Sequence, residues 1–214
     1  MKIGTDGVLL GAWVGCQTAE RVLDIGTGTG VIALMIAQRS AAQHIVGIDI
    51  DSGAAACAAA NFQASPWAPR LEATEGAVQN FAAERFDLIV TNPPYFTDSL
   101  LCPDARRSVA RHTTELSFEQ LDSSVCRLLT EEGRFALILP TEQMEAYLAL
   151  TALNLVRRCD VSTKPNVPPK RTMVELSPQP CDEVEHTTLT IDTEVHGIYT
   201  AEYRELTKDF YLKF

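Results

Sequence analysis

The chain has 214 residues, of which 46% are hydrophobic and 21% are charged. This length is enough for one sizeable core and short for two independent domains, so we expect residues 1–214 to form a single domain. The formal net charge of −10 argues against a surface that binds polyanions indiscriminately, so any contact with nucleic acid must be local. The apolar run from Val8 to Val14 is too short to span a bilayer, and no charged leader with a cleavage site precedes it. We therefore expect a cytoplasmic protein that is neither secreted nor membrane-spanning.

Cysteines are scattered along the chain without a CxxC pair. A domain of this size does not need disulfides in order to fold. We therefore expect reduced thiols and no metal site. The six positions are Cys16, Cys57, Cys102, Cys126, Cys159 and Cys181.

Short apolar runs organise the first two thirds of the chain. Their hydrophobic residues are continuous rather than alternating, which is typical of strands buried on both faces. A weaker strand is predicted over Arg70 to Thr74. The four strong runs are Arg21 to Ile25, His44 to Ile48, Phe86 to Thr91 and Arg134 to Leu139.

Helical stretches separate these runs. One of them has Ser117 as a predicted cap with Gln120 three residues on, and Gly133 just past its end. Strands that alternate with helices indicate a parallel sheet covered on both faces, with ligands at the carboxyl ends of the strands. The predicted helices span Val31 to Arg39, Ser52 to Gln63, Phe118 to Thr130 and Glu142 to Asn154.

The last third of the chain has a different pattern. Leu155 to Thr163 and Thr172 to Leu176 are predicted strands, joined by the proline-rich segment Lys164 to Arg171. That segment is too short for a crossover helix, so the two strands should be antiparallel. The predicted fold is therefore α/β and Rossmann-like, a doubly wound, mostly parallel sheet that ends in an antiparallel strand pair.

A glycine-rich turn, Asp24-Ile-Gly-Thr-Gly-Thr-Gly30, joins the first strand to the first helix of the alternation. Glycine there lets the backbone come close to a ligand. A dinucleotide-binding fingerprint needs a small residue where Val31 stands, which disfavours NAD. The DxGxGxG pattern instead resembles the first motif of class I S-adenosylmethionine (SAM)-dependent methyltransferases, where helix N-terminal amides face the methionine carboxylate. The resemblance implies a cofactor site that includes Asp24, Gly26, Thr27, Gly28 and Gly30.

An acidic residue follows the second strand, about twenty residues beyond the loop. At that position Asp49 can accept hydrogen bonds from both hydroxyls of a ribose, and Ile50 lies beside it. Asp51 either caps the following helix or serves as a second ligand. Methyltransferases often carry an Asp after the third strand that binds the adenine amine of SAM, and here Gly76 and Ala77 stand at that place. Adenine recognition would then depend on backbone groups or on Glu75.

The fourth predicted strand ends in Asn92-Pro93-Pro94-Tyr95. Each proline fixes its own φ, holds the preceding residue extended and lacks an N–H, so the turn is stiff. The Asn92 side-chain oxygen and the Pro93 carbonyl can therefore accept hydrogen bonds from a planar NH2 group. Such bonds stabilise the positive charge that develops as that nitrogen attacks a sulfonium methyl, and Tyr95 can stack on a flipped base. These four residues are the predicted catalytic set.

Enzymes with NPPY after a SAM fold include adenine-N6 methyltransferases of DNA or RNA and glutamine-N5 methyltransferases of release factors. The opening segment Met1 to Trp13 and the closing segment Tyr199 to Leu212 resemble the bacterial tRNA1(Val) adenine-37 N6-methyltransferase family, and the match covers essentially the whole chain. The resemblance implies a segment over the cofactor (1–19), a SAM-binding core with NPPY (20–140) and a C-terminal part with a terminal helix (141–214). It also implies that Thr5 and Asp6 lie near the methionine end of SAM. Alternatively, Thr5 caps a helix that starts near Asp6.

Members of that family usually carry a short segment ahead of the opening motif, which the sequence lacks, so we expect part of the substrate-side surface to be missing. Local basic clusters are the predicted contacts to the phosphates of tRNA near the anticodon. Residues 157–175 hold five basic and two acidic side chains, a local charge of +3, and a second cluster follows NPPY. Each cluster could instead be an ordinary solvated face. The predicted substrate-binding residues are Tyr95, Arg106, Arg107, Lys164, Lys170 and Arg171.

The sequence and the resemblance thus predict an enzyme that transfers a methyl group from SAM to the exocyclic N6 of an adenine in tRNA, with adenine 37 next to the anticodon of tRNA1(Val) as the favoured target. The sequence does not define the oligomeric state, although a monomer is favoured. A glutamine-N5 protein methyltransferase is the nearest alternative, but those enzymes resemble chains with a helical domain before the SAM fold. A second alternative is a protein that binds SAM or RNA without catalytic activity. The intact motif Asn92 to Tyr95 argues against this alternative, while Ala77 and the missing N-terminal segment argue for it.

Overall fold

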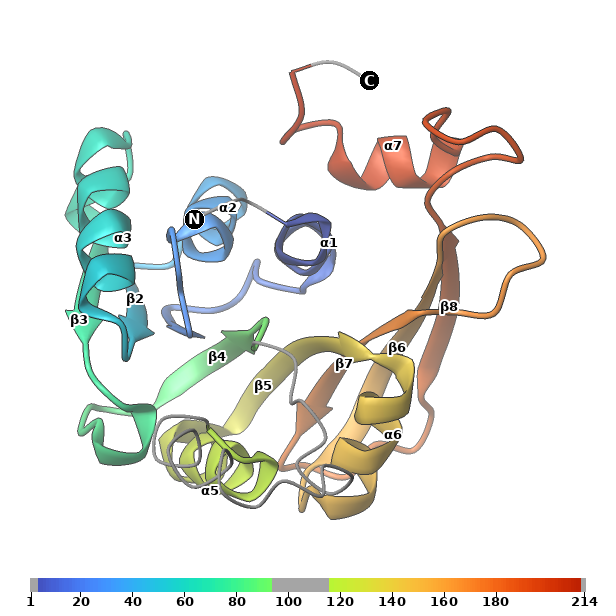
Figure 1. The fold of residues 1–214 in the computed structure, drawn as a ribbon. Helices are drawn as coiled ribbons and strands as arrows, with labels where there is room; N and C mark the ends of the chain where they lie inside the picture. Colours follow the sequence, from blue (N-terminus) through green and yellow to red (C-terminus); the bar gives the residue numbers. More distant parts are fainter. Residues whose placement is uncertain (1–3, 94–115, 213–214) are drawn as a thin grey trace, which may run out of the picture.

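An eight-stranded sheet runs through the computed structural model, which describes residues 4–93 and 116–212 (Figure 1). The strand order is β3-β2-β1-β4-β5-β7-β6-β8. The first five of these strands are parallel, β7 is antiparallel to both β5 and β6, and β8 is parallel to β6. The strands are β1 (Arg21–Ile25), β2 (His44–Asp49), β3 (Leu71–Glu75), β4 (Phe86–Thr91), β5 (Leu129–Pro140), β6 (Asn154–Ser162), β7 (Arg171–Ser177) and β8 (Glu185–Thr190).

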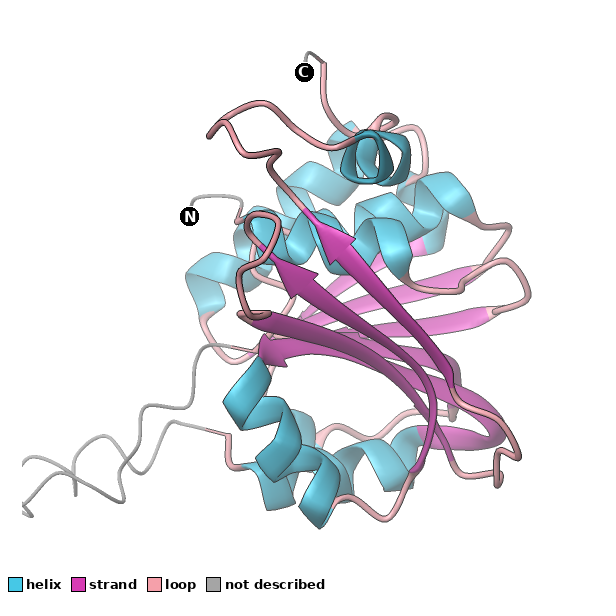
Figure 2. Ribbon diagram, turned by 90° about the vertical axis from the view of Figure 1, so that its right-hand side faces the viewer, coloured by secondary structure: helices cyan, strands magenta, loops and turns pink. Residues whose placement is uncertain are grey.

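Helices cover both faces of the sheet (Figure 2). Helices α1, α2, α3 and α7 pack on one face around Leu10, Ile36, Phe62 and Tyr203, and α5 and α6 pack on the other around residues such as Tyr147. The helices are α1 (Thr5–Trp13), α2 (Val31–Arg39), α3 (Ser52–Ala64), α5 (Phe118–Leu128), α6 (Thr141–Leu150) and α7 (Ala201–Thr207), with short 3-10 turns at Ala68–Arg70 and Val78–Asn80. None of the described helices has the length and apolar character needed to cross a membrane.

The predicted fold class is confirmed. Each of the predicted strands is present, and the strands joined by the proline-rich segment are antiparallel, with Cys159 opposite Met173. Ser117 and Gln120 form the predicted capping box at the start of α5.

Predicted helix ends were wrong in two places. Helix α5 ends at Leu128, because buried Leu129 already pairs with Phe86 in the sheet, and Gly133 lies inside β5 rather than beyond a helix. An added Cβ at Gly133 would lie 2.7 Å from the Leu129 side chain, so the glycine permits a close turn of the chain within the strand. Helix α6 ends at Leu150, and β6 begins at Asn154.

Strand β8 was not predicted. Its first four residues, Glu185 to Thr188, are exposed, so the segment lacks the apolar alternation by which strands are recognised. Its pairing with β6 extends the sheet beyond the antiparallel pair and carries the chain toward α7.

Candidate active site

The glycine-rich turn lies between β1 and α2, as predicted. Gly26, Gly28 and Gly30 all have positive φ angles, of 68°, 58° and 80°, a region that glycine adopts without strain. The amides of Gly26 and Thr27 donate to the Ile48 carbonyl of β2 over 2.8 and 3.1 Å, which fixes the turn to the sheet. An added Cβ at Gly26 would meet no atom within 4 Å, so the outer side of the turn is open to a ligand.

Asp24 lies beneath the turn and is fully buried. Its Oδ2 accepts from Thr27 Oγ1 over 2.7 Å and from the Ala33 amide over 3.3 Å, so one carboxylate oxygen holds both the turn and the first turn of α2. Within the described chain, the buried Oδ1 has no hydrogen-bond partner. Burial raises the pKa of Asp24 to about 7, the Thr27 and Ala33 bonds oppose that rise, and the Asp49 charge adds to it.

Two features of the site bear on whether SAM fits it: the unpartnered Oδ1 of Asp24 and the open glycine turn. A buried carboxylate without full compensation is costly, and a cationic ligand above the turn would offset that cost. The amides of the first turn of a helix lack partners within the helix, so the start of α2 offers donors to a carboxylate. The residues around the turn therefore suit a zwitterionic methionine group.

Asp49 ends β2 and is half-buried beside the turn. Its Oδ2 accepts from the Gly28 amide over 2.9 Å, and its Oδ1 accepts from the Asp51 amide over 3.0 Å. The carboxylate thus joins the turn to the start of α3, and each oxygen retains a further acceptor site for a ribose hydroxyl. Asp51 caps α3 by accepting a hydrogen bond from the Ala54 amide over 2.7 Å. Of the two roles considered for Asp51, the structure therefore shows the cap.

The proposed adenine-side residues follow β3. The Gly76 amide donates to the Asp49 carbonyl over 2.8 Å, and Ala77 precedes a short 3-10 turn. Glu75 pairs with Asp49 in the sheet register and is exposed. Gly76 is thus tied to the end of β2 by a backbone bond, and Ala77 follows it in the chain, while Ile50, just after β2, is 57% exposed.

The NPPY segment begins directly beside the glycine turn. Ile25 of β1 and Thr91 of β4 are partners in the parallel register, so Gly26 and Asn92 are the next residues on two neighbouring strands. Thr91 Oγ1 donates to the Ile25 carbonyl over 2.8 Å in the core, which holds the two strand ends together. Adjacent strands are about 4.8 Å apart. Asn92 is half-buried and Pro93 is buried at this edge.

Helix α1 covers the same edge. An added Cβ at Gly7 would lie 3.7 Å from Asn92 Nδ2 and 3.6 Å from Val31 Cγ1, so Gly7 lies between the asparagine and the start of α2. Thr5 is exposed at the first position of α1; Gly4 is the N-cap, without a side-chain cap bond, so the capping alternative for Thr5 was wrong. That α1 covers the cofactor stays a prediction, and the Asp6 side chain is directed toward Arg171.

Asp6 and Arg171 were assigned to different ligands, yet they form an ion pair with 2.8 Å between Arg171 Nε and Asp6 Oδ2. The pair joins α1 to the first residue of β7. Among the other basic residues of this cluster, Lys170 is exposed, and Lys164 Nζ lies 3.5 Å from the Glu194 carbonyl oxygen.

Two arginines of the basic segment 157–175 form ion pairs within the protein. Arg157 pairs with Glu175 and Glu185, and its guanidinium lies 4.3 Å from the centre of the Trp13 ring. Arg158 pairs with Glu145 and Asp160. Arg171 is paired as well, with Asp6, so Lys164 and Lys170 are the basic residues of this segment that form no ion pair within the described residues.

Four of the predicted site residues lie outside the described residues. They are Pro94 and Tyr95 of the catalytic set, and Arg106 and Arg107 of the substrate set.

Sequence reasoning missed residues that support the site from below. An added Cβ at Gly47 would lie 2.6 Å from Thr27 Oγ1, so this strand glycine makes room for the threonine that Asp24 binds. A glycine inside an apolar strand signals such a close approach. Gly7 and Thr91 were inside the quoted motifs, but only the register shows what they contact.

Comparison with known proteins identifies the family. A family model described as methyltransferase small domain matches residues 6–123. A tRNA1(Val) (adenine(37)-N6)-methyltransferase of Parabacteroides distasonis is 46% identical over 219 residues, which cover 100% of this chain and 92% of the relative. A protein of the same description from Phocaeicola vulgatus is 46% identical over 99% of this chain and 91% of its own length. The chain belongs to the tRNA1(Val) (adenine(37)-N6)-methyltransferase family.

Solved structures support the fold. A predicted O-methyltransferase from Agrobacterium tumefaciens superimposes with a TM-score of 0.73 over 95% of this chain and 96% of its own, at 17% identity. The family resemblance of the opening and closing segments is thus confirmed, as is the methyltransferase fold.

Proposed function

We propose that this protein transfers the methyl group of SAM to the N6 nitrogen of adenine 37 in tRNA1(Val), the activity for which its relatives are named. The observation that carries the proposal is the register of β1 and β4. It puts Gly26, the first residue of the cofactor turn, next to Asn92, the first residue of the acceptor turn. Donor and acceptor of the methyl group would therefore meet at one edge of the sheet, at the carboxyl ends of parallel strands.

Bound SAM would supply an electrophilic methyl group on a sulfonium sulfur. Asp49 would hold the ribose, the glycine turn and the start of α2 would hold the methionine carboxylate, and Asp24 would compensate the ammonium through its buried charge. Gly7 lets α1 close over this edge without a side chain between α1 and Asn92. Helix α1 would in this way exclude water from the reacting groups.

The target amine is a poor nucleophile because its lone pair is delocalised into the purine ring. In this proposal the Asn92 side-chain oxygen and the Pro93 carbonyl accept hydrogen bonds from that amine. Both bonds strengthen as the nitrogen becomes tetrahedral and positively charged, so they stabilise the transition state more than the ground state. The Asn92 side chain suits this role because it makes no hydrogen bond within the described chain.

A glutamine amide presents a similar planar NH2 group, so NPPY alone does not exclude a protein substrate. The decisive experiment incubates the enzyme and labelled SAM separately with tRNA that lacks the modification, with DNA and with a release factor. We expect label in tRNA as N6-methyladenosine, and nuclease mapping should locate it next to the anticodon. Label in a glutamine of the release factor, or no label in any of the three, would contradict the proposal.

A further inference from the structure

A second cavity opens at the same edge of the sheet, on the other side of α1. Its volume is about 400 Å³, within the range of small-molecule sites. It lies between α1, the ends of β6 and β8, the start of β7 and the segment that leads into α7, and we call it the α1–α7 pocket. Figure 1 shows how these elements are arranged. Thr5 and Asp6, which the family resemblance assigns to the methionine end of SAM, line it, whereas the glycine turn, Asp49 and Asn92 do not. The pocket therefore adjoins the proposed cofactor site without containing the groups that would hold the ribose and the methionine carboxylate.

The α1–α7 pocket adjoins the catalytic edge. Arg171, which lines the pocket, is paired in the sheet with Pro140, the last residue of β5. Strand β5 is parallel to β4, and β4 leads to Asn92. Consecutive residues of α1 face the two sites: Asp6 contacts Arg171 at the pocket, and the Cα of Gly7 faces Asn92, where an added Cβ would lie 3.7 Å from Asn92 Nδ2. A group bound in the pocket would thus be separated from the target amine by the first turn of α1.

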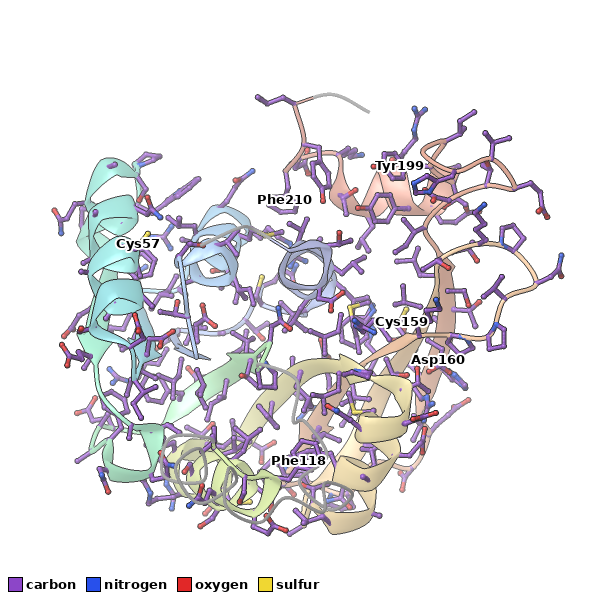
Figure 3. All side chains as sticks on the ribbon, in the orientation of Figure 1. Cys57, Phe118, Cys159, Asp160, Tyr199 and Phe210 are labelled. Atoms are coloured by element: carbon purple, nitrogen blue, oxygen red, sulfur yellow. The ribbon has the colours of Figure 1, made fainter. Side chains whose placement is uncertain are left out.

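The walls of the pocket combine an apolar floor with an aromatic side. Leu9, Val161 and Ile191 form apolar lining. Tyr199 and Tyr203 lie with their ring centres 5.0 Å apart, and Figure 3 shows Tyr199 on the segment before α7. A floor and side of this kind suit a flat aromatic group, because nucleobases stack on tyrosine rings with little dependence on sequence.

One exposed cation at the rim suits an anionic substituent. Of the other polar groups there, Arg171 is paired with Asp6, and Asp192 Oδ2 lies 2.7 Å from His196 Nδ1, so each carboxylate has a partner within the protein. Lys170 also lines the pocket, is exposed and makes no ion pair within the described chain. Its ammonium remains available for a phosphate, in a protein of net charge −10.

We propose that the α1–α7 pocket binds a nucleoside that neighbours the target adenine in the tRNA, with its base against Tyr199 and its phosphate at Lys170. This inference rests on the proposed function. The pocket would hold the strand in place once the adenine has been flipped toward Asn92, because the neighbouring base would keep a stacking partner after leaving the anticodon loop.

The test uses an anticodon stem-loop RNA and derivatives with an abasic site on one side or the other of the target adenine. Methyl transfer is measured with the parent enzyme, Tyr199→Leu and Lys170→Ala. For the intact RNA we expect both variants to raise KM about 10-fold, the order expected for one stacked base or one phosphate contact, with kcat and SAM affinity nearly unchanged. The RNA that lacks the base bound in the pocket should have a higher KM than the intact RNA with the parent enzyme. Replacing Tyr199 by Leu should not raise the KM for that abasic RNA any further.

Controls separate the pocket from general effects. Tyr199→Phe keeps the ring and should retain the parent KM. Lys208→Ala removes the same charge from an exposed site at the end of α7 and should also leave KM unchanged. Suppose that the parent enzyme methylates the intact RNA, but that each abasic site raises KM by the same factor with Tyr199→Leu as with the parent enzyme. The pocket inference is then wrong and the proposed function stands. If no RNA is methylated, the proposed function fails and the inference fails with it.

Discussion

Arg171 Nε and Asp6 Oδ2 are 2.8 Å apart, and this contact joins the first helix of the chain to a strand 165 residues later. The side chains are 27% and 20% exposed, so solvent screens the pair in part. We expect a double-mutant cycle with Asp6→Asn and Arg171→Gln to give a coupling of about 0.5–1 kcal/mol in urea unfolding. The exposed Lys208–Glu205 pair, as a matched control, should show no measurable coupling.

The same two variants test the functional assignments of Asp6 and Arg171. If Asp6 acts mainly by orienting Arg171, both substitutions should raise the KM for tRNA, non-additively, and leave SAM affinity unchanged. A weaker SAM affinity for Asp6→Asn alone would instead support the cofactor role that the family resemblance implies for Asp6.

A substitution at Gly47 would test whether the position of Thr27 beneath the glycine turn matters for stability and for SAM binding. Gly47→Ala would bring a Cβ to within 2.6 Å of Thr27 Oγ1, and the threonine would have to move away from Asp24. We expect a loss of about 1–3 kcal/mol in the free energy of unfolding, together with weaker SAM binding by calorimetry. Gly4→Ala is the control, since an added Cβ there meets no atom within 4 Å. It should leave SAM affinity unchanged, and because Gly4 is the N-cap of α1 it should lower stability by no more than about 1 kcal/mol. Parent-like SAM affinity in a folded Gly47→Ala protein would show that the position of Thr27 does not matter to the cofactor.

Asp24 predicts a pH dependence of stability. The pKa of Asp24 is about 7 in the folded state, against 3.8 for an unperturbed aspartate, so between these values the native state binds a proton that the unfolded state does not. The contribution of Asp24 to stability therefore falls as pH rises from about 4 to 7, by at most about 1.4 kcal/mol per pH unit. Urea unfolding of the ligand-free parent and of Asp24→Asn should differ in slope with that sign over this window. Parallel curves would show that the buried carboxyl has an ordinary pKa.

Much of this site was predictable because its residues stand at the ends of strongly apolar strands. The turn from Asp24 to Gly30, Asp49 and Asn92 follow β1, β2 and β4, whose buried runs are evident in the sequence. The Asp6–Arg171 pair was not predictable, since it depends on how α1 packs beside the start of β7. The α1–α7 pocket depends in addition on how β8 and α7 return over the sheet, and β8 has an exposed, polar sequence. Likewise, Arg157 and Arg158 counted as basic in the sequence, but their partners come from other strands and helices.

Asp49 is expected to bind the ribose of SAM. Asp49→Ala should weaken SAM binding by roughly 1–3 kcal/mol, through lost charge-assisted hydrogen bonds and a loosened Gly28 amide. Asp49→Asn keeps one acceptor and should lose less. Asp51→Ala is the matched control: it removes the cap of α3, so it should lower stability by about 1 kcal/mol with little change in SAM affinity. Calorimetry that shows unchanged affinity for a folded Asp49→Ala protein would remove Asp49 from the site.

Asn92 tests the chemistry of the acceptor turn. Asn92→Ala removes an acceptor that is used most strongly in the transition state, so kcat on tRNA should fall about 100-fold or more while tRNA binding changes little. The affinity for SAM should also be retained, because the glycine turn is held by Ile48 and Asp49 rather than by Asn92. Asn92→Asp keeps the size and an acceptor, and a carboxylate oxygen can accept from the adenine amine, so partial activity should survive. If Asn92→Ala kept a near-parental kcat in single-turnover measurements, hydrogen bonding by Asn92 would not drive the transfer in this protein, even with the fold and the cofactor site intact.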